Sequence, residues 1–568
     1  MAIALIEALK KATAQTGSSE AAQTIVSRFE QMAAQRGNWE SLWEEIVHYY
    51  YPTKEDDNFG LYSQSGNDKG ESRAHRVYDS RGPSALTKFA AVMDSLLTPR
   101  HAKWQTFIHP DKEIMKDRGV REWLEMLTDT VFKRRYGPFA NFMSQNNRVL
   151  KNCGGLGTAA LFVDEASDMG LGTRYKSIPL SQLYIAENHQ GIVDTVYRAF
   201  MMTSGQLIKQ FGTEVAGPVI MSKYRTAPEE MMWVLHAVGP NIMYREDLEG
   251  YGPGGMPYYS YYILIDEKRI LREGGYHTMP YCLSRYEIED DEVYGRSPAM
   301  ALLPTVKTLN AQKRSVLRQG NFATDPAWLL TDNGVLPTFK VRPGTMISGG
   351  LDAEGRRRME PMPVGQVATG HQLMEMEHAA VDDGFFLNVF QVLIQNPQQT
   401  ATEVLEKARE KNVFLSPSLG RQESEYLSHL AMRDVDIILR QGDMPPVPAL
   451  LEEAGGQYDL IYNNPLSKLQ RAEETAGAIR TVQQAMEIAG NTQDMSHLDH
   501  FNFDKIWPKL AENQSMPLDW INPMKTVQQK RQARAQQQQE QQAQQGQQGE
   551  AAMLQAAAKM QESERPAV

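Results

Sequence analysis

Two long helical patterns, separated by an insert, dominate the middle of the chain. From Ala299 to Gln319 apolar residues recur at helical spacing, and a second such pattern covers Gln366 to Val392. The insert at 323–363 is interrupted by Pro and Gly. A polar loop, 393–401, leads from the second pattern into a third long helix over 402–440. The pattern indicates a projecting pair of helices rather than a closed pocket.

The residues before this stretch predict a body of helices and strands. Helical spacing covers 18–51 and resumes at Gly82-Pro83, where proline suits the first turn of a helix. Two more helices are expected before Cys153. From there to Tyr286, short apolar runs alternate with turn residues, which is typical of β-strands. We therefore expect an α+β, helix-rich fold.

The residues after Arg440 predict smaller elements. A strand is expected at 458–462 and a helix at 465–488. From 525 onward the chain is of low complexity, and 533–548 is almost entirely Gln, Ala, Glu and Arg. Gln and Ala favour helices, so this segment predicts either an exposed or packed helix or a disordered tail.

Composition narrows the function classes. The chain has 568 residues, of which 41% are hydrophobic and 23% charged, as expected for a globular protein of two to four domains. Its net charge of −11 argues against tight groove-reading of DNA, which relies on basic residues. Two cysteines, Cys153 and Cys282, are too few for a disulfide framework. We expect neither a signal peptide nor a membrane span.

Catalytic motifs are missing from the sequence. It contains no GxxxxGK[ST] phosphate loop and no GxSxG elbow, and the glycines at 154–157 favour a tight turn before a strand at Ala159. His497, Asp499 and His500 lack a further ligand at metal-binding spacing, and His378 is expected on a solvated helix face. We therefore predict no enzyme activity, no metal and no cofactor.

Basic residues mark one side of the first long helix. Lys307, Arg314 and Arg318 recur at i, i+7 and i+11, with Lys313 beside them. This pattern is typical of a solvated helix face, and it also suits a face that contacts a polyanion. The sequence leaves both interpretations open, and these four residues are the candidates for contact with DNA.

Two further segments carry candidate contacts. The insert contains a group of basic residues that indicates a solvated loop or a contact with an acidic partner or DNA: Lys340, Arg342, Arg356, Arg357 and Arg358. The polar loop carries four neutral amides, which either join two helices or make weak, transient contacts with DNA phosphates: Gln395, Asn396, Gln398 and Gln399.

Short segments spread from about Arg28 to Arg471 carry a family resemblance. They include Tyr49-Tyr50-Tyr51-Pro52, Val77-Tyr78-Asp79-Ser80, Leu97-Thr98-Pro99, Tyr294-Gly295-Arg296-Ser297-Pro298, Thr400-Ala401-Thr402-Glu403-Val404 and Ile461-Tyr462-Asn463-Asn464-Pro465. In this order and spacing the chain resembles the portal, or head-to-tail connecting, proteins of short-tailed bacteriophages.

The resemblance implies a subunit with an α/β wing, a two-helix stem, a small α/β clip and a helical crown. The wing would cover 1–295 and the helix 402–440, and the crown 441–524, followed by the Gln/Ala-rich tail 525–568. The stem helices would be 296–322 and 364–392. The insert 323–363 would be the clip, and 393–401 the channel loop.

The resemblance also implies partners and a location. Portal proteins form a homo-oligomeric ring, usually of twelve copies, at one capsid vertex of the virion, after assembly in the cytoplasm of the host bacterium. Double-stranded DNA passes through it without sequence recognition, driven by a separate terminase. Tail adaptor, major capsid and scaffold proteins contact the ring. Two other classes stay open: a metal-dependent nuclease, and a structural protein of the tail or of ejection.

Overall fold

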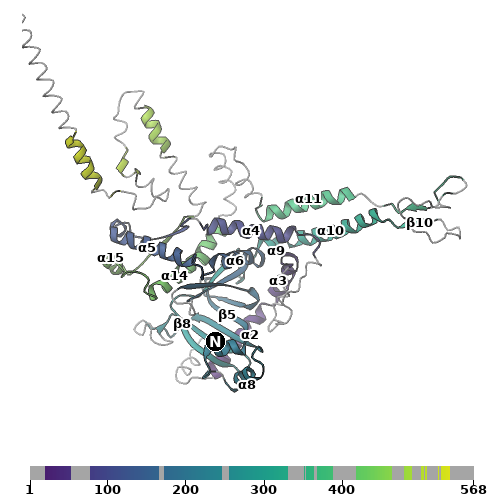
Figure 1. Ribbon diagram of the computed structural model, residues 1–568, viewed down its shortest axis with the longest axis horizontal. Coiled ribbons are helices and arrows are strands. Elements are labelled where there is room, and N and C mark those ends of the chain that lie inside the picture. Colours follow the sequence, from purple (N-terminus) through teal and green to yellow (C-terminus); the bar gives the residue numbers. More distant parts are fainter. Residues whose placement is uncertain are drawn as a thin grey trace, which may run out of the picture. The chain divides into compact units, whose positions relative to one another are not determined.

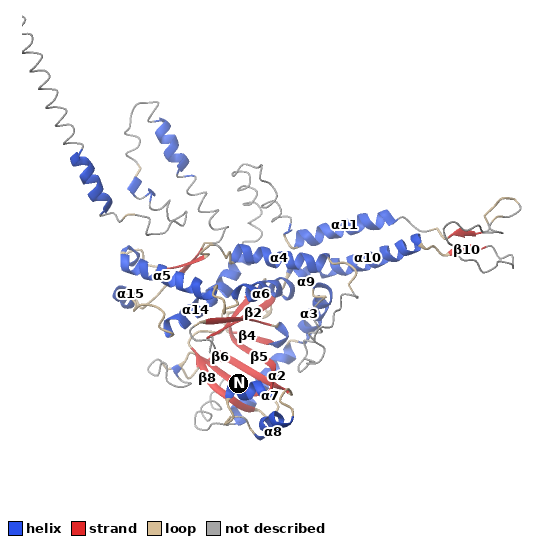
Figure 2. Ribbon diagram, viewed as in Figure 1, coloured by secondary structure: helices blue, strands red, loops and turns tan. Residues whose placement is uncertain are grey.

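A computed structural model places most of the chain. It describes residues 19–52, 77–100, 102–165, 172–215, 217–245, 255–330, 351, 354–357, 359–363, 367–387, 417–463, 477, 479–488, 501–504, 506–507, 522 and 526–537. The chain divides into two units, 1–464 and 465–568, which are described separately. Helices and sheets alternate through the first unit (Figures 1 and 2), which confirms the α+β prediction.

A five-stranded antiparallel sheet lies at the centre of one part of the first unit. Its strands follow in the order β4 (Leu183–Glu187), β5 (Val193–Thr203), β6 (Met231–Pro240), β7 (Tyr258–Leu264) and β8 (Arg269–Tyr276). Side chains of a strand alternate between the two faces of a sheet. Odd-numbered residues of β5 to β7 form one apolar cluster, and even-numbered residues of β6 and β7 form another. Both faces of the sheet are therefore buried.

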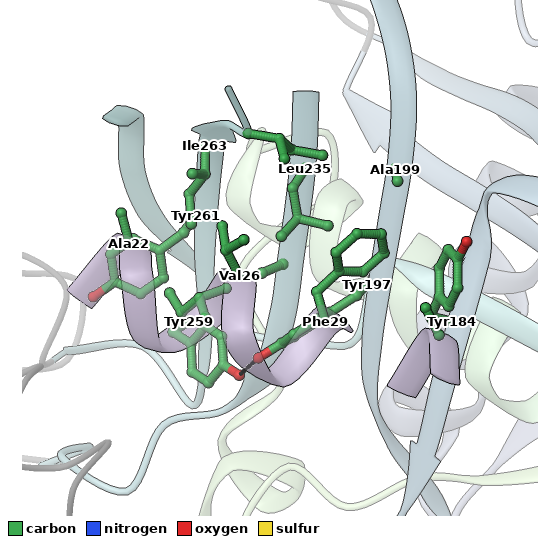
Figure 3. Close-up of a cluster of buried hydrophobic side chains, with 14 residues drawn as sticks. Ala22, Val26, Phe29, Tyr184, Tyr197, Ala199, Leu235, Tyr259, Tyr261 and Ile263 are labelled. Atoms are coloured by element: carbon green, nitrogen blue, oxygen red, sulfur yellow. Dashed lines mark hydrogen bonds between the residues drawn. The ribbon is translucent and has the colours of Figure 1, made fainter. Parts of the chain in front are cut away.

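Helix α2 (Ser19–Gln35) covers the first face. Ala22, Val26 and Phe29 point from α2 toward Tyr197, Leu235 and Ile263 of the sheet (Figure 3). The same figure shows the hydroxyls of Tyr197 and Tyr259 hydrogen-bonded to each other, 3.3 Å apart. The second face is covered by α7 (Ser204–Phe211) and α8 (Pro218–Thr226), which contribute Leu207 and Ile220.

A second layer combines helices with a three-stranded sheet. Its helices are α3 (Gly37–Tyr50), α4 (Arg81–Leu97) and α6 (Phe142–Leu156), and its strands follow in the order β3 (Thr173–Ile178), β2 (Thr158–Glu165), β9 (Tyr281–Arg285). A 3₁₀ turn, Leu180–Gln182, joins β3 to β4. The predicted helix over 18–51 is thus two helices, α2 and α3, which meet at Arg36 and Gly37.

A third layer joins segments far apart in the sequence. Strand β1 (Gln105–Ile108) pairs with β12 (Asp459–Tyr462), and α5 (Arg118–Arg135) packs with α14 (Ser428–Arg440) and α15 (Ala449–Glu453) around one apolar core. A short 3₁₀ turn, Ile114–Lys116, leads into α5, and a π-helical segment, Gln422–Leu427, into α14. Residues 441–463, expected in the crown from the sequence, thus pack on this layer.

Buried charges connect α5 to α14. The guanidinium of Arg135 donates to the carboxylate of Asp434 at 2.6 Å, and the Tyr175 hydroxyl donates to the same carboxylate at 2.7 Å. Burial raises the pKa of Asp434, whereas the neighbouring Arg135 acts in the opposite direction. Separating the pair would leave a buried charge without a partner, which is strongly unfavourable. The pair therefore fixes how the two helices meet.

The long helical patterns correspond to an adjacent helix pair. After a short α9 (Pro298–Ala301), helix α10 (Leu303–Thr324) leads to β10 (Trp328–Leu330), which pairs with β11 (Met359–Pro361). Helix α11 (Val367–Gly384) then lies beside α10 (Figure 1). The predicted helix over 402–440 is described from 417 onward, and the polar loop 393–401 lies outside the described residues.

The described part of the second unit is helical at 479–488 and 526–537. Arg531 forms an exposed ion pair with Asp504 at 2.5 Å within this unit. The Gln/Ala-rich segment is helical up to 537, and its remainder lies outside the described residues. None of the helices that the structure describes combines the length and the apolar character needed to cross a bilayer.

Candidate functional site

Helices α10 and α11 form an antiparallel hairpin, here called the stem. A Cβ added at Gly370, early in α11, would lie 2.5 Å from Val316, late in α10. At the other end of the pair, a Cβ at Gly384 would lie 2.6 Å from Leu302. The start of α11 thus lies near the end of α10, and the end of α11 near the start of α10, which shows that the helices are antiparallel. Glycine at both positions lets the helices approach closely, and a small apolar cluster fills the space between them: Leu309, Val316 and Met374.

Residues 77–81, here called the strap, connect the stem to α4. The side-chain oxygen of Asn310 in α10 accepts hydrogen bonds from the backbone amides of Tyr78, at 2.6 Å, and Asp79, at 3.3 Å. One amide side chain thus satisfies two consecutive backbone donors that precede α4.

The strap also contacts the second stem helix. Nε2 of His378 lies 3.1 Å from a carboxylate oxygen of Asp79, and Arg81 forms a two-pronged ion pair with Asp382, its Nε donating at 2.7 Å. Two hydrogen bonds from one guanidinium restrict orientation as well as distance. The strap therefore holds α10 and α11 together at their base.

The stem meets the body through two glycines in contact. Gly157 ends α6 in the left-handed conformation, with φ of 78°, and a Cβ there would overlap the backbone of Gly295. A Cβ at Gly295 would in turn lie 2.5 Å from the carbonyl oxygen of Gly157. The hydroxyl of Ser297 caps α9 by accepting from the amide of Met300, and donates to the carbonyl of Gly155 at 2.8 Å.

Aromatic rings pack beside this joint. Tyr294 lies edge-on to Trp43 at 5.2 Å between ring centroids, and the indole of Trp43 donates to the carbonyl of Leu156 at 3.1 Å. The guanidinium of Arg296 sits 4.5 Å from the ring centre of Trp39. The segment 294–298 is thus a structural junction between body and stem.

The predicted basic side of α10 is partly engaged within the chain. Lys307 forms an ion pair with Glu45 of α3 at 2.6 Å, and the guanidinium of Arg314 lies 5.8 Å from the ring centre of Tyr78. Lys313 is half-buried and Arg318 is exposed. Lys307 is therefore paired within the chain, whereas Arg314 lies beside Tyr78 and remains exposed, and contact between any of the four residues and DNA stays a prediction.

The candidate residues of the insert are described only in part. Arg356 and Arg357 are exposed, as a partner contact requires, and Arg356 lies 3.5 Å from Glu354. The remaining candidates of the insert and of the polar loop lie outside the described residues: Lys340, Arg342, Arg358, Gln395, Asn396, Gln398 and Gln399.

Other sequence-based interpretations meet the structure directly. Gly157 forms the expected tight turn before the strand, which begins at Thr158, but Gly154 and Gly155 lie in the last turn of α6 and give room to Phe89 and Tyr51. The expectation that His378 faces solvent is wrong, because its ring is half-buried against Asp79 in the strap. Within the described residues no group of His, Cys, Asp and Glu is arranged to hold a metal ion. His497, Asp499 and His500 lie outside those residues.

Sequence reasoning missed the strap. Its anchors are single polar residues in otherwise ordinary helices, and their partners are about 230 to 300 residues away in the sequence. One signal was present: Asn310 and Asp382 are polar positions next to the buried Leu309 and Val381. A polar residue at the margin of a buried face often has a specific partner.

Comparisons with known proteins agree with the resemblance. The family model described as bacteriophage head to tail connecting protein matches residues 22–522. A "Probable portal protein" of Bordetella phage BPP-1 is 27% identical over 85% of both chains, and a "Portal protein" of Salmonella phage epsilon15 is 24% identical over 90% of both.

A solved structure, the virion of a native gene transfer agent particle, contains a chain that is 12% identical, covering 71% of this chain and 85% of its own. Its TM-score of 0.31 is too low for a fold assignment. The family match, by contrast, spans the body, the strap and the stem. This chain therefore belongs to the family of bacteriophage head-to-tail connecting proteins.

Proposed function

We propose that this protein is the portal of a phage capsid. Copies of the chain form a ring at one vertex, genomic DNA enters through its channel during packaging and leaves through it at ejection, and the tail attaches to it. The observation that carries the proposal is the family match over residues 22–522, supported by relatives whose names are portal proteins.

We propose the following roles for the parts. The stem, α10 and α11, forms the wall of the channel, and the insert 323–363 contacts the terminase and the tail adaptor. The loop 393–401 narrows the channel. Exposed Arg356 and Arg357 support a contact between the insert and an acidic partner surface.

The charge of the chain suits a conduit through which DNA slides. A net charge of −11 per copy repels phosphates, so DNA is not held tightly in the channel. Sequence-specific recognition would require side chains that read base edges, and a moving duplex presents no fixed sequence. We therefore assign the protein no catalytic step, and the energy for packaging comes from a separate terminase.

Electron microscopy of the purified chain tests the proposal. Two-dimensional class averages should show closed rings with a central hole, and co-expression with capsid and scaffold proteins should place one ring in each particle. A chain that stays monomeric with those partners contradicts the portal function. Magnesium-dependent cleavage of DNA by the highly purified chain would instead favour the nuclease.

A further inference from the structure

The two stem helices carry opposite charges. Helix α10 contains four basic residues and no acidic one, whereas α11 contains four acidic residues and no Lys or Arg. The described ion pairs of these residues lead to the body and the strap and not to the other stem helix: Lys307 pairs with Glu45, and Asp382 with Arg81. The basic residues are thus on one helix and the acidic residues on the other, and the described ion pairs do not join the two helices.

Part of this charge lies on the outer sides of the hairpin. Val316 of α10 packs with Met374 of α11. Arg314 and Arg318 each lie two residues from Val316, roughly 200° around the helix, and therefore on the side of α10 that faces away from α11. Both are exposed.

The outer side of α11 has the opposite charge. Met376 and Asp383 each lie two residues after a buried residue of the packed face, Met374 and Val381, and are therefore directed away from α10. Glu375 is also exposed, about 100° around the helix from Met374 and therefore on the flank between the packed face and the outer side. No described residue forms an ion pair with Arg318, Glu375 or Asp383.

Each outer side also exposes a large apolar side chain. Phe322 on α10 is 49% exposed and Met376 on α11 is 70% exposed. Single exposed apolar side chains are common on protein surfaces, and here each lies beside the charged residues described above. One side is basic and apolar, and the other is acidic and apolar, so the two sides are complementary to each other.

We propose that the outer side of α10 in one copy binds the outer side of α11 in the next copy. This rests on the proposed function and specifies how neighbouring stems meet. A two-fold contact would place α10 against α10 and oppose like charges, whereas a head-to-tail contact pairs opposite charges and can close into a ring. The role differs from the DNA contact that the sequence predicts for Arg314 and Arg318.

Charge reversal in full-length protein tests the contact. The first variant, Arg314→Glu with Arg318→Glu, makes the outer side of α10 acidic, and the second, Glu375→Lys with Asp383→Lys, makes the outer side of α11 basic. Each variant alone brings like charges together at every boundary. At about 0.05 M salt, where screening is weak, we expect at least about tenfold less assembled protein, measured by sedimentation velocity and class averages.

Co-expression of the two variants is the decisive experiment. In a ring with an even number of copies, alternating first-variant and second-variant copies pair opposite charges at every boundary, so the co-expressed variants should assemble to wild-type levels. A control with Lys112→Glu and Lys209→Glu changes two exposed charges outside the stem and should assemble normally. Far-ultraviolet circular dichroism checks that each chain is folded.

The outcomes separate the two proposals. If wild-type protein forms no ring, the proposed function fails and this contact fails with it. If wild type forms rings and either variant alone does so equally well, or the mixture does not recover, the contact is wrong and the portal function stands. Normal rings that retain less DNA would return Arg314 and Arg318 to a role in the channel.

Discussion

At the scale of single residues, neighbouring main-chain atoms leave no room for a side chain at position 157. Gly157 has a φ of 78° and a Cβ there would overlap the backbone of Gly295. Gly191 has a φ of 76° but has nothing within 4 Å of an added Cβ, so it is a matched control. Gly191→Ala should lower the free energy of unfolding by about 1 to 2 kcal/mol, and Gly157→Ala by about 3 to 5 kcal/mol.

Urea denaturation followed by tryptophan fluorescence measures the difference, because Trp43 hydrogen-bonds to Leu156 beside this turn. Equal losses of unfolding free energy at the two positions would mean that the backbone around Gly157 and Gly295 shifts to accommodate the added Cβ at little cost. The sequence identifies the glycines as a turn, but only the folded chain brings the Gly295 backbone against Gly157.

His236 makes the central sheet sensitive to acid. Its ring is buried, stacks on Tyr262 with centroids 4.1 Å apart, and hydrogen-bonds to Tyr281 and Ser260. Burial, and then the charges of Arg198 and Arg272, hold its pKa well below the ordinary value of 6.5. The unfolded chain therefore binds a proton that the folded chain does not, and stability falls as the pH drops below 6.5 toward the folded-state pKa.

We expect His236→Gln to reduce this pH dependence. The variant should be less stable than wild type at neutral pH, because the hydrogen bonds to Tyr281 and Ser260 are weakened. Its denaturation midpoint should change less between about pH 7.5 and pH 5 than that of wild type, since the titrating ring is gone. Parallel pH profiles would show that other groups cause the acid sensitivity.

At the scale of elements, the width of the stem depends on the small residues of α11. A Cβ at Gly370 would lie 2.5 Å from a methyl carbon of Val316, so Gly370→Ala should push the helices apart and cost about 1 to 3 kcal/mol. Adding Val316→Ala removes that methyl and should recover part of the loss. Amide hydrogen exchange in α11 measures the effect.

Gly320→Ala in α10 is the control, because nothing lies within 4 Å of its added Cβ. It should stabilise the helix by up to about 1 kcal/mol, the difference in helix propensity between Ala and Gly. Additive effects of Gly370→Ala and Val316→Ala would contradict a direct contact between the two positions.

Helical periodicity predicts the two stem helices but not the contacts that attach them to the strap and to each other. The first stem helix follows from the spacing of apolar residues and ends at Thr324, five residues after the predicted Gln319. The second begins at Val367, one residue after the predicted start, but ends at Gly384, eight residues before the predicted Val392. The strap depends on partners such as Asn310 with Tyr78, which no local pattern connects. The side of α10 directed toward α11 becomes evident only when Val316 and Gly370 are seen in contact.

At the scale of the molecule, we expect the first unit to fold without the second unit but not without residues 441–463. Truncation after residue 464 keeps every strand of the first unit, including β12, and should leave its melting temperature nearly unchanged. Truncation after Arg440 removes β12, α15 and Leu451, and so opens the core around α5. That shorter chain should be degraded much faster in limited proteolysis. Equal resistance of the two truncated chains would mean that residues 441–463 add nothing to the body.

The pairing of β1 with β12 also has a consequence for synthesis. Gln105 pairs with Tyr462, and Arg135 pairs with Asp434, so the third layer of the body cannot be completed until about four-fifths of the chain has left the ribosome. The stem lies between these partners in the sequence and emerges before Asp434 and Tyr462. The oppositely charged outer sides of the stem are therefore exposed before the body has finished folding. Stems of neighbouring nascent chains on the same messenger RNA can thus bind each other before either body is complete.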